Sequence, residues 1–121
     1  MPQQIPEELR NKLAQFQTLQ QQLQMMAVEK QRRVLEKGEL EEASKELETA
    51  KGDVYASVGP LLIKSSKTNL GKEIKEKISS AENSVKLLEN QEQKLTTKLQ
   101  ELQKDLQSSL AGVQDVPGTA Q

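Results

Sequence analysis

The feature that most constrains this chain is a run of seam residues spaced alternately three and four apart over residues 74–113. This spacing places the side chains on one narrow stripe of an α-helix, the seam of a coiled coil. Only Glu92 and Ser109 interrupt its hydrophobicity. The sequence therefore predicts a long helix over about residues 68–111. The seam consists of Ile74, Ile78, Ala81, Val85, Leu88, Glu92, Leu95, Leu99, Leu102, Leu106, Ser109 and Val113.

A less regular stripe occupies the first half of the chain. Pro6 and the two glutamates after it favour a helix start, because proline needs no N–H partner there and acidic groups suit the helix dipole. One series is Leu9, Leu13, Phe16, Leu23, Ala27 and Val34, with Gln20 and Lys30 as polar seam positions. A second series, one residue out of phase, is Leu40, Ala43, Leu47, Ala50 and Val54. We expect a helix over about residues 6–52, with a bend or local unwinding near residues 35–39, around Gly38.

The composition favours a thin structure over a globule with a thick core. Hydrophobic residues make up 34% of the chain, with one Phe, one Tyr and no Trp. Two helices of similar length suit an antiparallel hairpin, which needs only an apolar stripe on each helix. We therefore predict a mainly α fold, a single domain over residues 1–121, in which two long helices form an antiparallel coiled coil joined by a β-hairpin. The tail, about residues 112–121, is expected to be disordered.

The connecting segment, about residues 53–66, is rich in strand formers around the turn pair Gly59-Pro60. A two-residue loop would pair Val58 with Leu61, and one apolar face would then hold Val54, Ala56, Val58, Leu61 and Ile63. The other face would carry Tyr55, Ser57, Leu62 and Lys64. An isolated two-stranded ribbon is marginal in water, so its open edges and apolar face favour assembly with other chains.

The two ends of the predicted hairpin offer a second apolar region. In an antiparallel arrangement Ile5, Leu9, Leu13 and Phe16 approach Leu99, Leu102, Leu106 and Leu110. These residues either close the coiled coil or leave apolar surface for another protein near frayed ends. Met25 and Met26 are similarly open to two interpretations: an adaptable contact surface, or simple packing against the neighbouring helix.

Several function classes are disfavoured. The chain has no His and no Cys, so the usual zinc sites and imidazole-based catalysis are absent, and no glycine-rich phosphate loop occurs. We predict no enzymatic activity, no metal and no cofactor. The 17 basic and 18 acidic residues are interleaved, which argues against nucleic-acid or membrane partners. The first residues lack a signal-peptide pattern, and we expect a cytoplasmic protein.

Three stretches are distinctive: the Gln-rich segment over residues 13–23, the bend over residues 54–64, and residues 73–78. Together they resemble the prefoldin family, in particular its archaeal β-type subunit, over about residues 5–110. The bend is the specific part, since it combines a tyrosine-containing strand, a Gly-centred turn and an apolar second strand. The single predicted β-hairpin resembles that of the β-type subunit, whereas the α-type subunit has two.

The resemblance implies a hexamer of two α-type and four β-type subunits, in which the hairpins join into a β-barrel. It also implies an ATP-independent chaperone that binds unfolded client proteins at the coiled-coil ends and passes them to a group II chaperonin. Assembly would use Val54, Ala56, Val58, Leu61 and Ile63. Client binding would use Ile5, Leu9, Leu13, Phe16, Leu102, Leu106 and Leu110. The alternative is a coiled-coil adaptor or spacer subunit of another complex.

Overall fold

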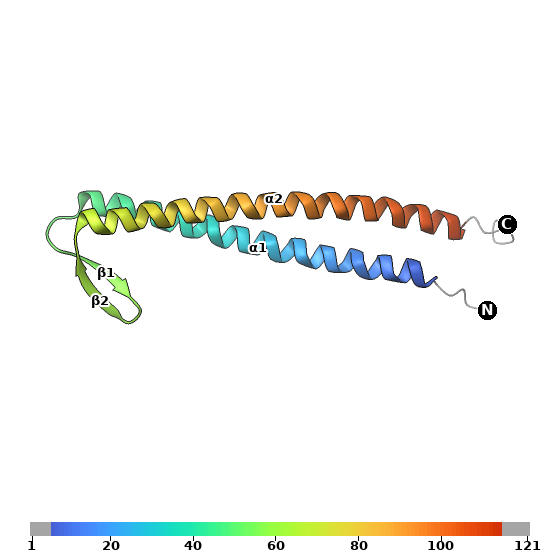
Figure 1. The fold of residues 1–121 in the computed structure, drawn as a ribbon, viewed down its shortest axis with the longest axis horizontal. Helices are drawn as coiled ribbons and strands as arrows, with labels where there is room; N and C mark the ends of the chain where they lie inside the picture. Colours follow the sequence, from blue (N-terminus) through green and yellow to red (C-terminus); the bar gives the residue numbers. More distant parts are fainter. Residues whose placement is uncertain (1–5, 115–121) are drawn as a thin grey trace. The chain divides into compact units, whose positions relative to one another are not determined.

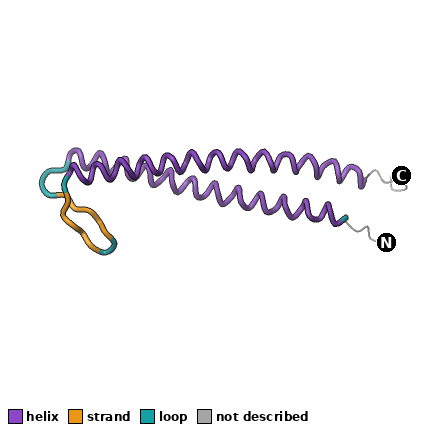
Figure 2. Tube along the Cα trace, viewed as in Figure 1, coloured by secondary structure: helices purple, strands orange, loops and turns teal. Residues whose placement is uncertain are grey.

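The computed structural model describes residues 6–114, with side chains described for residues 6–111. The element order is α1 (Glu7–Thr49), β1 (Val54–Val58), β2 (Leu61–Ser65) and α2 (Lys67–Gln114) (Figures 1 and 2). Two long helices pack together and are joined by a two-stranded antiparallel hairpin, as predicted. The helix α2 includes residues 112–114 of the predicted tail, and residues 115–121 lie outside the described part.

The chain divides into two compact units. The terminal unit comprises Met1–Val28 and Asn90–Gln121, and the hairpin unit comprises Glu29–Glu89. An ion pair joins α1 to α2 within each unit: Lys12 Nζ lies 3.1 Å from Asp105 Oδ2 in the terminal unit, and Lys37 Nζ lies 3.4 Å from Glu82 Oε1 in the hairpin unit. In the hairpin unit the Lys67 amine also bonds the carbonyl oxygen of Glu48. Because Lys67 precedes Glu82 while Glu48 follows Lys37, the two helix segments of this unit run antiparallel.

The predicted seam of α2 is confirmed wherever its side chains are described. Ile74, Ala81 and Leu106 are buried, and the other predicted seam residues up to Ser109 are half-buried. The polar Glu92 is among the half-buried residues. Val113 belongs to α2, but its side chain lies outside the described residues. The regular heptad of this helix therefore sufficed to identify its packing face.

The predicted phase change in α1 is wrong. The helix is continuous through residues 35–39, and its seam keeps one register from Leu9 to Leu47. Of the predicted seam positions, Gln20, Ala27 and Val34 are exposed, whereas Lys30 is half-buried as predicted. Arg33 and Lys37, which were not predicted there, also take half-buried seam positions. Long basic side chains can lay their aliphatic stems along a seam while their charged ends reach water. A prediction based mainly on apolar residues therefore misplaced the seam in the middle of α1. The less exposed side chains of α1 are Leu9, Lys12, Leu13, Phe16, Leu19, Leu23, Met26, Glu29, Lys30, Arg33, Lys37, Leu40, Ser44 and Leu47.

The helix termini have clear local causes. The carbonyl oxygen of Pro6 accepts the first helical hydrogen bond, from Arg10 N at 3.0 Å, and Glu7 and Glu8 follow at the positive end of the α1 dipole. Ser66 caps α2, because its hydroxyl oxygen accepts a bond from Asn69 N at 3.1 Å. Within residues 6–114, no helix is apolar enough over a sufficient length to cross a membrane.

Candidate functional site

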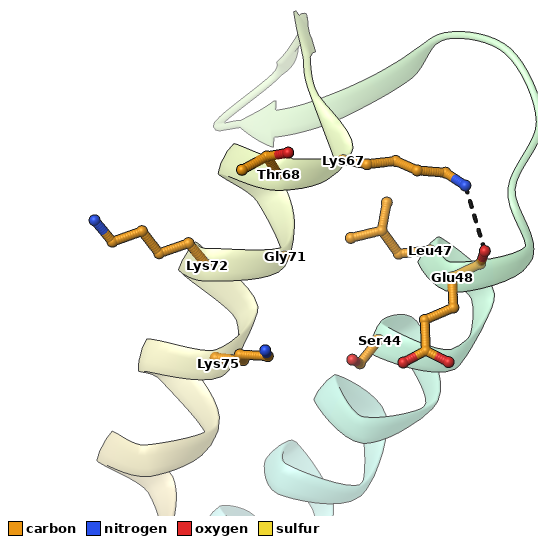
Figure 3. A pocket seen from close by; sticks show the side chains of 8 residues that line it. All are labelled: Ser44, Leu47, Glu48, Lys67, Thr68, Gly71, Lys72 and Lys75. Atoms are coloured by element: carbon orange, nitrogen blue, oxygen red, sulfur yellow. Dashed lines mark hydrogen bonds between the residues drawn. The ribbon is translucent and has the colours of Figure 1, made fainter.

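A hydrogen bond joins the two helices at the base of the β-hairpin. The Lys67 amine, at the start of α2, donates a hydrogen bond of 3.3 Å to the carbonyl oxygen of Glu48 in the last turn of α1 (Figure 3). That carbonyl has no helical partner, so the lysine satisfies an orphan acceptor and suits the negative end of the dipole. Gly52, with φ +86°, lets the chain leave the helix in a conformation that other residues rarely adopt. The hairpin therefore departs from a fixed base.

Close packing supports this base. Gly71 has no side chain, and a Cβ placed there would lie 3.6 Å from Leu47 Cδ2. Figure 3 shows the Leu47 side chain directed towards Gly71 across the gap between the helices. Around this contact is a hollow of about 450 Å3 with several cationic side chains at its edge. It is lined by Ser44, Leu47, Glu48, Lys67, Thr68, Gly71, Lys72 and Lys75.

The predicted strand register is confirmed. Val58 pairs with Leu61, Ala56 with Ile63, and Val54 with Ser65. Gly59 has φ +57° at the first loop position, and Pro60 follows it, which fits a type II′ turn. The turn thereby fixes which side chains share a face.

The predicted assembly face leaves large apolar side chains open to solvent. Val58 is 55% exposed, Leu61 61% and Ile63 49%, whereas Val54 and Ala56 are half-buried. At the rate of ~25 cal/mol per Å2 of apolar surface, covering these side chains by another chain would be favourable. This face is therefore a candidate contact surface, and the assembly role of its residues stays a prediction.

The opposite face also exposes apolar groups, which are not among the predicted assembly residues. Leu62 is 74% exposed, and Tyr55 lies on the same face. The signal was present in the run Leu61-Leu62-Ile63, because three consecutive apolar residues break the alternation expected of a strand with one solvated face. Both faces of the ribbon are therefore candidates for contact.

The predicted client-binding residues divide into buried and exposed groups. Leu9 and Leu106 are only 5% and 6% exposed, so they pack within the terminal unit. Leu110 is 44% exposed and is available as the structure stands. Leu13, Phe16 and Leu102 are half-buried, and Ile5 lies outside the described residues. The closed arrangement thus presents only part of the predicted surface, and the client-binding role of these residues stays a prediction.

The described residues offer little for metal chemistry. No group of three or more His, Cys, Asp or Glu side chains that could hold a metal ion lies among them. Their charges form ion pairs on the surface and between the helices instead. What the arrangement can do is present apolar surface.

Comparison with known proteins gives a consistent result. The family described as "Prefoldin subunit" matches residues 10–112. The prefoldin subunit beta of Thermococcus kodakarensis is 41% identical over 110 residues, covering 89% of this chain and 94% of the relative. The corresponding subunit of Methanothrix thermoacetophila is 37% identical over 108 residues, covering 88% of this chain and 90% of the relative.

Solved structures agree in fold. The crystal structure of the prefoldin beta subunit from Thermococcus strain KS-1 superposes with a TM-score of 0.78 at 40% identity, covering 89% of this chain and 96% of that one. The beta2 subunit from the same strain, at 20% identity and a TM-score of 0.66, shares the fold. The single hairpin between two packed helices, the family match and these relatives together show that the chain belongs to the prefoldin family of non-enzymatic chaperones, as a β-type subunit.

Proposed function

We propose that this chain assembles with α-type prefoldin subunits, as four β-type and two α-type chains, into an ATP-independent chaperone of the cytoplasm. The observation that carries the assembly step is the exposed apolar face of the hairpin, at Val58, Leu61 and Ile63. A two-stranded ribbon is marginal alone, and joining ribbons from several chains covers its faces and edges.

In this proposal the helix ends hold unfolded client proteins. Leu110 offers exposed apolar surface, and local opening of the ends would add Leu9 and Leu106. Each end makes weak contacts, but several ends on one assembly raise the effective concentration and retain a client without nucleotide. Transfer to a group II chaperonin completes the proposed cycle.

The test is light scattering of a chemically denatured protein diluted into the assembled complex of this chain with an α-type subunit. The matched control is a complex whose β-type chain lacks residues 1–16 and 103–121. Suppression of aggregation by the intact complex alone supports holding at the helix ends. Transfer is then tested by adding a group II chaperonin with ATP and measuring recovery of the client's native activity.

A second candidate is a coiled-coil adaptor subunit that binds one defined partner. The burial of Leu9 and Leu106 favours it, because ends that stay closed present little surface to varied clients. The same experiment separates the two: an adaptor would leave the aggregation of several unrelated denatured proteins unchanged, even when the complex has the correct mass.

A further inference from the structure

A hollow of about 500 Å3 lies between α1 and α2 in the terminal unit, and none of the predicted client-binding residues lines it. Its lining combines three apolar side chains, two amides and two lysines. Met26 and Leu95 are half-buried seam residues, and Met25 beside them is 72% exposed. The residues are Gln22, Met25, Met26, Gln91, Lys94, Leu95 and Lys98.

The methionines make this hollow adaptable. Met26 lies half-buried at the seam, and Met25 is open to solvent. A thioether side chain is unbranched and repacks easily around differently shaped groups. The hollow can therefore accept an apolar side chain without requiring one particular shape.

The charge at the hollow is one-sided. The α1 sequence has no charged residue from Leu13 to Val28, so α1 brings only apolar and amide groups to it. The lysines Lys94 and Lys98, one turn apart on α2, supply its two cations. Among the described side chains neither lysine has an ion-pair partner, and the acidic Glu92 is at the seam and not in the lining.

We propose that this hollow binds an extended segment of an unfolded client in which an apolar side chain is flanked by carboxylates. The apolar group enters between Met25 and Leu95, and the carboxylates pair with Lys94 and Lys98. The amides of Gln22 and Gln91 can donate to and accept from the segment's peptide groups. This inference rests on the proposed holding function and adds to it a site and a charge preference.

The test uses the assembled complex and three fluorescent peptides that share one apolar centre but carry Glu, Gln or Lys flanks. The Glu-flanked peptide should bind most tightly, and its affinity should fall as salt is added. The double variant Lys94→Glu/Lys98→Glu should weaken its binding about tenfold and reverse the preference towards Lys flanks. The exposed Met25→Gln should weaken all three peptides while leaving their order intact.

The matched control is Lys104→Glu, an exposed lysine of α2 outside this hollow, which should change nothing. Equal binding of the three peptides, or an equal loss in the control, would overturn the proposal. A change in the mass of the complex with Met25→Gln would also overturn it, by showing that the hollow joins copies of the chain. Suppression of client aggregation is measured in parallel: if it persists while the peptides bind without charge preference, this inference fails and the holding function stands.

Discussion

In the hairpin unit, large apolar side chains of β1 and β2 lie open to solvent, whereas in the terminal unit Leu9 and Leu106 are among the most buried of the described residues. The cause is geometric. Two helices can each bury a stripe against the other, but a two-stranded ribbon has nothing to cover its faces. The proposed assembly surface is thus preformed, and most of the proposed client surface becomes available only when the helix ends open.

The seams of the two units differ as well. In the terminal unit, α1 contributes apolar residues such as Phe16, Leu19 and Leu23. In the hairpin unit, Lys30, Arg33 and Lys37 take consecutive seam positions of the same helix. Basic stems bury less apolar area than leucines, so the α1 seam contributes less apolar burial in the hairpin unit than in the terminal unit.

The largest effect is expected from Val58→Asp, which places a charge on the exposed apolar face. An interface that covers it would bury an unpaired carboxylate, which costs several kcal/mol, so association should fall by at least about a hundredfold. Native mass spectrometry of the chain mixed with an α-type subunit measures the loss of the hexamer.

The companion variant Ser57→Asp separates the two faces of the ribbon, because Ser57 lies opposite Leu62. Normal assembly of Ser57→Asp would show that only the Val58 face is covered. If Val58→Asp still forms the hexamer, the Val58 face is not the assembly surface. The difference between a preformed assembly surface and closed helix ends would then not hold.

A large loss of stability is expected from Leu106→Ala. Leu106 is buried in the terminal unit, and truncating a buried leucine typically costs about 2–5 kcal/mol. Leu110→Ala should cost well under half of that, since this side chain is exposed. Thermal unfolding followed by circular dichroism gives the difference, and equal losses would mean that the helix ends are already open in solution.

A smaller, functional effect is expected from Leu110→Ser. Removing an exposed apolar contact should raise the amount of complex needed to suppress aggregation about threefold, with little change in stability. Ser108→Ala, an exposed change two residues away, is the control. If the two variants suppress aggregation equally well, Leu110 does not contact the client.

The sequence could predict features that depend on regular spacing. The α2 seam followed from its heptad, and the strand register followed from Gly59-Pro60. Lys30 was correctly expected at the seam, but the middle of α1 was misplaced because Arg33 and Lys37 were taken for surface residues, although their long stems lie at the seam. The hollow at Met25 could not be predicted from the sequence, because its charge depends on which α2 lysines lie opposite an uncharged stretch of α1.

The smallest effects are expected from reversing the charge of one seam lysine in each unit. Lys12 and Lys37 are matched: each pairs with a glutamate of its own helix, Glu8 or Glu41, and with an acid across the seam. The Lys37 side chain is 36% exposed and Lys12 22%, so Lys37→Glu should cost about 1 kcal/mol or less and Lys12→Glu somewhat more.

Thermal unfolding at low and high salt measures both variants, and added salt should shrink both losses because it screens partly exposed pairs. The reciprocal change Glu82→Lys should recover part of the stability lost with Lys37→Glu, since it restores an opposite-charge pair across the seam. A loss at Lys37 larger than that at Lys12 would mean that the hairpin unit depends on its ion pairs more than their exposure suggests, and that its cationic seam holds the helices in register.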